Sequence, residues 1–216
     1  MKTAFHTIIL AIAFITIPVF CYAEKAPDYS IKTSSTGQQL TIYLSGLIRS
    51  PMASDLKTII NHHGHHLPIV LKLNSEGGSI YETEEIINLL RSLSDLTTEV
   101  NNGSECSSNC VPIFAQGKSR RAGPVAAFMF HGIAIYAISN IPDPELTNKM
   151  ISFYQRADID MNFFERLKNK KVYSTPGMYW LSGKELFDTK ANIVTQLLER
   201  HQVATPYDYS YSTKPN

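Results

Sequence analysis

A serine between two cysteines is the residue in this sequence best placed to act as a nucleophile. Ser108 stands in the segment Cys-Ser-Ser-Asn-Cys at 106–110, directly before an apolar run, and His131 closes a later apolar run. A serine hydroxyl becomes nucleophilic when a histidine takes up its proton, so the pair indicates acyl-transfer chemistry. The alternative is that Ser108 only caps the following helix and that backbone groups satisfy His131.

A pair of glycines supplies a further part of such a site. Gly77 and Gly78 follow a short apolar run that is typical of a strand. Backbone N–H groups beside glycine can approach an oxygen on which negative charge develops during acyl transfer. The alternative is that the glycines only turn the chain, since glycine adopts positive φ at no steric cost.

The N-terminal segment has the features of a signal peptide over residues 1–23. Lys2 precedes an apolar stretch at 8–20, and the small residue Ala23 stands ahead of charged residues. This pattern predicts cleavage after Ala23 and a periplasmic or secreted protein. Two alternatives stay open, an uncleaved membrane anchor and acylation at Cys21, although the bulky residues before Cys21 fit a lipoprotein signal poorly.

Export changes the chemistry expected of the two remaining cysteines. Cys106 and Cys110 are four positions apart, and at helical spacing their Cα separation lies within the range of a disulfide. Thiols in an oxidising compartment tend to pair, so we expect a disulfide across Ser108. The alternative is two buried thiols that act as small hydrophobic groups.

A histidine tract is the other cluster that could bind a metal. Four of the five residues at 62–66 are histidines, and such tracts can bind zinc, copper or nickel. No cysteine or carboxylate completes a site beside them in the sequence, so we expect a solvated loop and no metal site. Lys118, Arg120 and Arg121 are likewise expected in a solvated turn.

Length and charge predict one globular domain without a nucleic-acid partner. The chain has 216 residues and is 44% hydrophobic, enough to bury one full core. Lys and Arg number 20 and Asp and Glu number 19, so no strong field would gather nucleic acid. We expect a linker over residues 24–37, the domain over 38–204 and a flexible tail over 205–216.

Apolar periodicity predicts an α/β fold. Alternating apolar residues indicate strands, and leucine and isoleucine at helical spacing indicate helices between them. The succession is that of repeated strand–helix units with right-handed crossovers. The predicted strands are residues 39–44, 68–73, 99–100 and 126–130, and the predicted helices are residues 54–61, 80–93 and 111–116.

The C-terminal third has a different pattern. Residues 144–171 are charged and carry an incomplete apolar stripe, which predicts one long helix that projects from the core. Ser182 and Glu185 form the capping-box start of a short helix through Phe187. Residues 193–195 are predicted as a final strand.

The order of these segments resembles the ClpP-type serine peptidases of the ClpP/crotonase superfamily, and within it the exported bacterial ClpP-like proteins. The resemblance covers about residues 39–195 and implies an α/β fold of repeated ββα units with a projecting C-terminal helix. It also implies a peptide or protein substrate, a homo-oligomer and no cofactor. An ATP-driven unfoldase is not expected as a partner outside the cytosol. The motifs that carry the resemblance are Asn-Ser-Glu-Gly-Gly at 74–78, Cys-Ser-Ser-Asn-Cys at 106–110, Gly117, Arg120-Arg121, Pro124 and His131.

The resemblance also implies roles for single residues. Ser108 matches the nucleophile at a helix N-terminus, and His131 matches the general base. Gly78, helped by Gly77, and the N–H of Asn109 match the donors of the oxyanion hole. The crotonase branch would use acyl-CoA, which an exported protein rarely meets, and no lysine replaces His131 in a serine–lysine dyad.

The third member of the triad is where the sequence departs from the family pattern. Met178 stands where ClpP-type peptidases have an aspartate, and methionine cannot orient an imidazole. Candidates for a replacement are Thr175, Asp158, Asp160 or a backbone carbonyl. The sequence therefore favours an exported serine hydrolase that cleaves peptide bonds, and it leaves open a catalytically inactive binding or assembly protein with the same fold.

Overall fold

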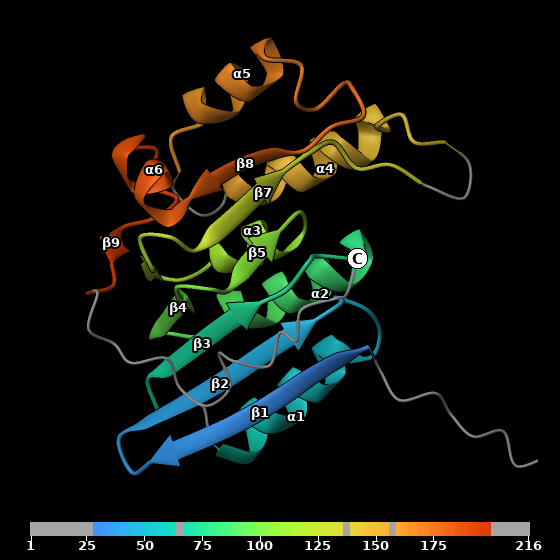
Figure 1. Ribbon diagram of the computed structural model, residues 1–216. Helices are drawn as coiled ribbons and strands as arrows, with labels where there is room; N and C mark the ends of the chain where they lie inside the picture. The colour runs from blue at the N-terminus through green and yellow to red at the C-terminus, as the bar shows by residue number, and fades with distance from the viewer. Residues whose placement is uncertain (1–27, 64–66, 136–138, 156–158, 200–216) are drawn as a thin grey trace, which may run out of the picture.

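The computed structural model describes residues 28–63, 67–135, 139–155 and 159–199 (Figure 1). The predicted signal peptide and C-terminal tail lie outside the described residues. Within these ranges, no helix is both long and apolar enough to cross a membrane.

A six-stranded sheet forms the larger layer of the molecule. Its strands run in the order β1-β2-β3-β4-β6-β9. β1 is antiparallel to β2, and every other neighbouring pair is parallel. The parallel pairs confirm the predicted strand–helix succession, since each parallel step needs a crossover connection. The strands are β1 (Tyr29–Thr36), β2 (Gln39–Gly46), β3 (Ile69–Asn74), β4 (Leu96–Val100), β6 (Ser119–Ala122) and β9 (Gln196–Leu197).

Two helices follow strands of this sheet, and a third, short helix follows a strand of the second sheet. α1 (Met52–His63) and α2 (Ile80–Arg91) lie along one side of β1 to β3 (Figure 1). They meet the strand side chains that are buried, such as Leu40, Ile42 and Leu44 of β2. α3 (Cys110–Phe114) is a single short helix with all five residues buried.

A second, three-stranded sheet carries the segments that the sequence singled out. It consists of β5 (Glu105–Ser107), β7 (Ala127–Phe130) and β8 (Tyr179–Ser182), with β7 in the middle. β5 and β7 are parallel, whereas β8 is antiparallel to β7. The carboxyl ends of β5 and β7 therefore lie at the same edge, and the residues that follow them are neighbours.

The C-terminal third corrects two of the predicted elements. Residues 144–171 form two helices instead of one, α4 (Pro144–Gln155) and α5 (Asn162–Asn169). Asp160 explains the start of α5, because its Oδ1 accepts a hydrogen bond from the Asn162 N–H at 3.0 Å. The last strand is β9, which begins after the predicted residues 193–195.

Two further predictions from the N-terminal and central regions were wrong. The range 24–37 contains β1, which pairs with β2 along its whole length instead of forming a linker. Arg120 lies in β6, not in a solvated turn, and is only 6% exposed. Its guanidinium donates to the carbonyl oxygens of Gly117 and Asn192 at 2.6 to 3.0 Å. These bonds tie the end of the chain to the large sheet.

The predicted capping box is confirmed at α6 (Gly183–Asp188). The Ser182 hydroxyl accepts from the Glu185 N–H, and the Glu185 carboxylate accepts from the Ser182 N–H at 2.7 Å. The two bonds to Ser182 lower the pKa of Glu185. Because Ser182 is also the last residue of β8, the capping box fixes where the third strand of the small sheet ends.

Candidate active site

The small sheet brings Ser108 and His131 into direct contact. Ser108 directly follows β5, and His131 directly follows β7. His131 Nε2 lies 2.7 Å from Ser108 Oγ, which is hydrogen-bond distance. The two residues whose chemistry first stood out in the sequence therefore form a serine–histidine dyad.

The backbone at Ser108 adopts a conformation that is rare for a residue with a side chain. Its φ angle is 52°, in the left-handed region. The Ser108 N–H donates to the Met129 carbonyl at 2.9 Å, and its carbonyl accepts from the Val111 N–H at 3.1 Å. Strain of this kind persists only where the surroundings hold it, and it is frequent at functional sites.

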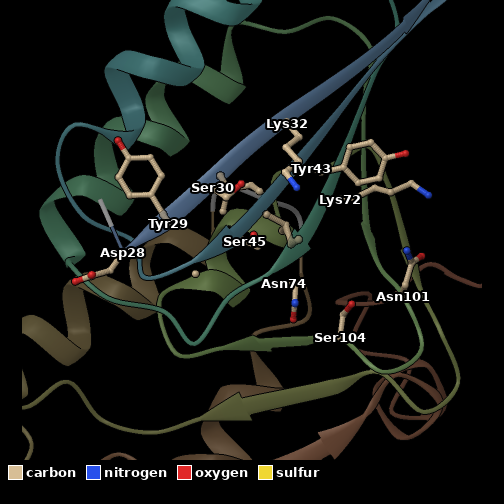
Figure 2. A pocket seen from close by; sticks show the side chains of 13 residues that line it. Asp28, Tyr29, Ser30, Lys32, Tyr43, Ser45, Lys72, Asn74, Asn101 and Ser104 are labelled. Atoms are coloured by element: carbon tan, nitrogen blue, oxygen red, sulfur yellow. The ribbon is translucent and has the colours of Figure 1, made fainter. Parts of the chain in front are cut away.

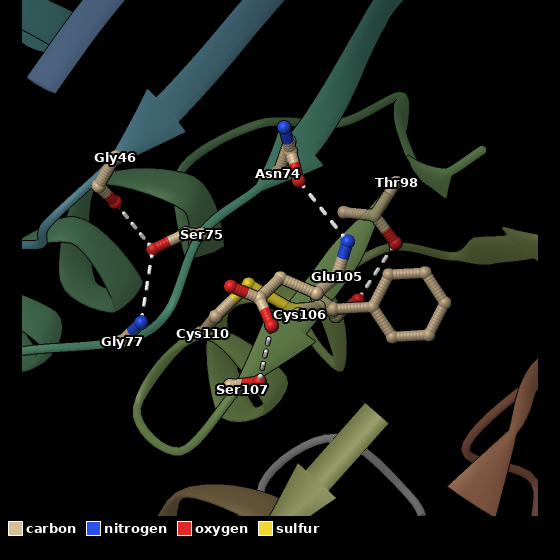
Figure 3. The surroundings of a disulfide bond; sticks show 10 residues. Gly46, Asn74, Ser75, Gly77, Thr98, Glu105, Cys106, Ser107 and Cys110 are labelled. Carbon is tan, nitrogen blue, oxygen red and sulfur yellow. Dashed lines mark hydrogen bonds between the residues drawn. A yellow bond between two sulfur atoms is a disulfide. The ribbon is translucent and has the colours of Figure 1, made fainter. Parts of the chain in front are cut away.

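A disulfide closes the turn around Ser108. It joins Cys106, within β5, to Cys110, the first residue of α3 (Figure 3). Their Cα atoms are 5.2 Å apart, and both residues are fully buried. The structure thus contains the disulfide that the sequence predicted, and it ties the strand before Ser108 to the helix after it.

The two glycines pack directly against this turn. A Cβ added to Gly77 would lie 2.8 Å from the Ser108 Cβ and 3.1 Å from the Asn109 nitrogen. A Cβ added to Gly78 would collide with the carbonyl of Ile48. Both glycines also have positive φ, 97° and 144°. Close approach and backbone conformation therefore both require glycine here.

Ser75 and Asn109 hold the glycine turn in place. The Ser75 hydroxyl donates to the Gly46 carbonyl at 2.6 Å and accepts from the Gly77 N–H at 3.1 Å (Figure 3). The Asn109 side-chain amide donates to the Gly78 carbonyl at 2.7 Å. Sequence reasoning missed both positioning contacts, because the carbonyls of Gly46 and Gly78 that accept these bonds lie far along the chain from Ser75 and Asn109.

The N–H groups of Gly78 and Asn109 are available for an incoming group. Within the described ranges, neither N–H donates a hydrogen bond to the protein. The Gly77 N–H differs, because Ser75 Oγ already accepts it. The geometry thus separates the two glycines, and it leaves Gly78 rather than Gly77 as a donor beside Ser108.

Burial sets the charge state of His131. Removal from water lowers the pKa of the imidazole below its usual 6.5, and a hydrogen bond with the Gly132 backbone acts in the opposite direction. The ring is therefore neutral near pH 7. A neutral imidazole can accept a proton from Ser108 Oγ, as a general base must.

No carboxylate among the described residues hydrogen-bonds with His131. The Thr175 hydroxyl donates to the Lys171 carbonyl at 2.9 Å, and the Asp160 carboxylate is bonded to Asn162. Neither residue therefore serves as the third member of a triad. Asp158, the other candidate, lies outside the described residues.

Met178 lies opposite His131 all the same. β7 and β8 pair Phe130 with Tyr179, so the next step of the antiparallel register places His131 across from Met178. Met178 is 63% exposed. The position that faces the imidazole is thus occupied by an exposed thioether, which cannot accept a strong hydrogen bond from the ring.

Only part of the histidine tract lies within the described residues. His62 and His63 are the last residues of α1, whereas residues 64–66 lie outside the described ranges. Among the described residues, no group of three His, Cys, Asp or Glu side chains is placed to hold a metal ion.

A hollow lies on the face of the large sheet that carries the less buried strand residues. It has a volume of about 390 Å³ and is lined by residues of β1, β2 and β3, including Lys32, Tyr43 and Lys72 (Figure 2). Lys72 Nζ lies 3.1 Å from Glu99 Oε2, so the protein already pairs this cation. Asn74 and Ser104 form the wall of this hollow nearest β5.

Comparison with known families agrees with this geometry. The Clp protease family model matches residues 29–161, more than half of the chain. The chain belongs to the Clp protease family. The matched range contains the glycine turn, Ser108 and His131 but ends before Met178. Comparison with curated proteins finds no match.

Family membership fits the architecture as well as the motifs. The mixed α/β fold, with its parallel strands and crossover helices, is the ClpP-type fold that the sequence predicted. β1 lies at the start of the matched range although the sequence prediction placed it outside the domain. The family domain therefore begins about ten residues earlier than predicted.

Proposed function

We propose that this Clp protease family member is a serine hydrolase that cleaves peptide bonds. The observation that carries the proposal is the 2.7 Å contact between His131 Nε2 and Ser108 Oγ at the end of two parallel strands. A neutral histidine at hydrogen-bond distance from a serine is the arrangement that activates the hydroxyl.

The reaction follows from these atoms in two stages. Ser108 Oγ attacks the substrate carbonyl carbon while His131 Nε2 takes the hydroxyl proton. The N–H groups of Gly78 and Asn109 donate to the oxyanion, and His131 then gives the proton to the leaving amine as the peptide bond breaks. Water attacks the resulting ester by the same route in reverse, which releases the acid product and restores Ser108.

The proposal extends to the compartment in which the protein acts. Cleavage after Ala23 would leave residues 24–216 as the mature, exported protein. The Cys106–Cys110 disulfide supports this assignment, because disulfides persist mainly in oxidising compartments. Intact mass of the protein from a periplasmic fraction tests it, and a mass that retains residues 1–23 would contradict it.

We also propose that the protein forms a homo-oligomer. Ile135 and Ile141, between β7 and α4, are 45% and 62% exposed, and large apolar side chains on a surface frequently mark an interface. Light scattering on the mature protein should give a multiple of the monomer mass. A monomer mass at micromolar concentration would contradict this part of the proposal.

A second candidate function is an inactive binding or assembly protein. Its support is specific, since the position opposite His131 holds Met178 and no described carboxylate orients the imidazole. Loss of the triad acid can cost about 10,000-fold in turnover while residual catalysis remains. The two candidates therefore differ in whether any hydrolysis depends on Ser108.

Peptide hydrolysis by matched serine variants distinguishes these candidates. We expect the mature protein to cleave a mixture of unstructured peptides, and we expect Ser108→Ala to abolish the cleavage. Ser107→Ala is the control, because Ser107 is the neighbouring serine and is also buried, and among the described residues its hydroxyl hydrogen-bonds only with Glu105, at 3.5 Å. Equal cleavage by wild type and Ser108→Ala, or none by folded wild type, would contradict the proposed hydrolase.

A further inference from the structure

The outer face of the small sheet extends from the dyad to a second hollow; Glu105 and Ala127 are half-buried on it, and Ser107 and Met129 between them and the dyad are buried. Glu105 pairs with Ala127, and Ser107 pairs with Met129. Because paired residues share a face and side chains alternate along a strand, Glu105, Ala127 and Met129 lie on one face, and His131 continues it. The other face carries Cys106, Phe128 and Phe130 and is buried in the core.

The hollow lies where this face has its smallest side chain. Its volume is about 360 Å³, and it is lined by Asn74, Gly103, Ser104, Glu105, Val125 and Ala127. The small methyl group of Ala127 leaves the space open between its neighbours. Val125 is 71% exposed at the rim. The hollow thus combines two apolar side chains, Val125 and Ala127, with polar groups and one charged group, as ligand sites commonly do.

Glu105 is the charged group of this hollow, and the protein does not supply it with a cation. Its Oε2 lies 3.5 Å from the Ser107 hydroxyl (Figure 3). Its backbone is fixed on both sides, since its N–H donates to Asn74 Oδ1 and its carbonyl accepts from the Ser75 N–H. Within the described ranges, no lysine or arginine forms an ion pair with Glu105. A carboxylate that has a hydroxyl partner but no cationic one among the described residues favours a cationic ligand.

The distance from Glu105 to the dyad is short enough for one extended peptide substrate to reach both. Glu105 pairs with Ala127, which lies four residues before His131, or about 13 Å along the strand at roughly 3.3 Å per residue. An extended peptide whose scissile bond lies at Ser108 would therefore reach the hollow about four residues away. The neighbouring hollow of the large sheet shares Asn74 and Ser104 with it, so the peptide could continue beyond.

We propose that the hollow beside Glu105 is a substrate subsite that selects a lysine or arginine side chain about four residues from the scissile bond. The aliphatic stem of such a side chain packs on Ala127 and Val125, and its charged end reaches the Glu105 carboxylate. This inference rests on the proposed peptidase function, because it assigns a preference to that same site.

Position-scanned peptides test the subsite. Quenched fluorescent peptides that carry lysine or glutamate at each of the third to fifth positions on either side of the scissile bond are compared by kcat/KM. We expect lysine to be preferred over glutamate by about three- to fivefold at one of these positions, the range of a partly exposed ion pair. Glu105→Gln should remove the preference, and Glu105→Lys should reverse it.

The matched control is Glu165→Gln, which removes an exposed carboxylate of α5 that pairs with Lys168. It should keep the wild-type ratio of lysine to glutamate cleavage. Ala127→Leu fills the hollow by size alone and should reduce cleavage of the lysine peptide toward that of the glutamate peptide. Circular dichroism and thermal unfolding confirm that each variant is folded.

A binding measurement separates failure of the subsite from failure of the peptidase. Anisotropy of a labelled lysine peptide on Ser108→Ala protein requires no turnover, and its affinity should fall by about three- to fivefold in the Ser108→Ala, Glu105→Gln double variant. Equal ratios and equal affinities with and without Glu105 would overturn the subsite, whatever the outcome for hydrolysis. Binding that depends on Glu105 in a protein without hydrolysis would retain the subsite and overturn only the peptidase.

Discussion

The turn that carries Ser108 contacts His131 directly, whereas Met178 stands at the next step of the strand register from His131, and the two segments differ in how firmly they are held. Ser108 is 8% exposed and lies inside a disulfide, and strand and glycine contacts surround it. Met178 is 63% exposed and directly precedes β8. The fold thus holds the nucleophile and its base firmly, whereas the position of the triad acid carries a methionine.

The comparison indicates which part of a triad this fold preserves. The serine turn and the glycine turn position atoms that react or carry developing charge, which small shifts would disable. The residue opposite His131 only orients and stabilises the ring, and the hydrogen bond with the Gly132 backbone, which raises the pKa of His131 against the effect of burial, performs part of that task. The predictions below test each side of this comparison.

Among the residues around the dyad, the largest loss is expected from Gly78→Ala. The added methyl group would collide with the Ile48 carbonyl and could not adopt φ of 144° without strain. Displacement of the Gly78 N–H should lower kcat by about 100- to 1,000-fold, as removal of one oxyanion donor does. Gly37→Ala is the control, because nothing lies within 4 Å of a Cβ there. Unchanged kcat in Gly78→Ala would contradict the oxyanion role.

A gain in activity is expected from Met178→Asp, at the position of the missing triad acid. The register places the new carboxylate opposite His131, where it can orient the ring and stabilise its charged form. We expect kcat/KM to rise by about 10- to 100-fold, a fraction of what a triad acid provides. Met178→Asn has the same shape without the charge and should give a much smaller gain. No gain in Met178→Asp would show that the acid position is not the limiting defect.

A smaller effect is expected when the disulfide is removed. The Cys106→Ala, Cys110→Ala double variant should lose about 2 kcal/mol of unfolding free energy and several-fold in the rate of hydrolysis, because Ser108 is less firmly held. Denaturant unfolding with and without dithiothreitol measures the stability change. Reductant should destabilise the wild type and leave the double variant unaffected. Equal activity in both proteins would show that the disulfide does not position Ser108.

The smallest expected effect is on the pH at which activity reaches half its plateau. Because burial lowers the pKa of His131, the imidazole stays neutral to a lower pH than a free histidine. Activity should therefore rise with pH and reach half its plateau below about pH 6.5. In Met178→Asp the same midpoint should move to higher pH, since a nearby carboxylate favours the protonated ring. A midpoint above 6.5 in the wild type, or no shift in the variant, would contradict this electrostatic account.

The sequence predicted the dyad because its two residues end apolar runs that are recognisable as strands. It could not predict Arg120, whose burial depends on the Asn192 carbonyl far along the chain. β1 was missed because five of its eight residues are exposed, so its sequence lacks the apolar pattern of a core strand. The start of α5 depends on a local hydrogen bond of Asp160 that periodicity does not reveal. Long-range pairing and local capping, rather than composition, account for the differences.

The central claim is that Ser108 is a nucleophile activated by His131. Its most direct test is to treat the mature protein with a fluorophosphonate probe and to locate the adduct by mass spectrometry of proteolytic fragments. The account predicts one adduct on Ser108 that is greatly reduced in His131→Ala and persists in Ser107→Ala. Folded protein without an adduct, or an adduct on another serine that survives Ser108→Ala, would contradict it.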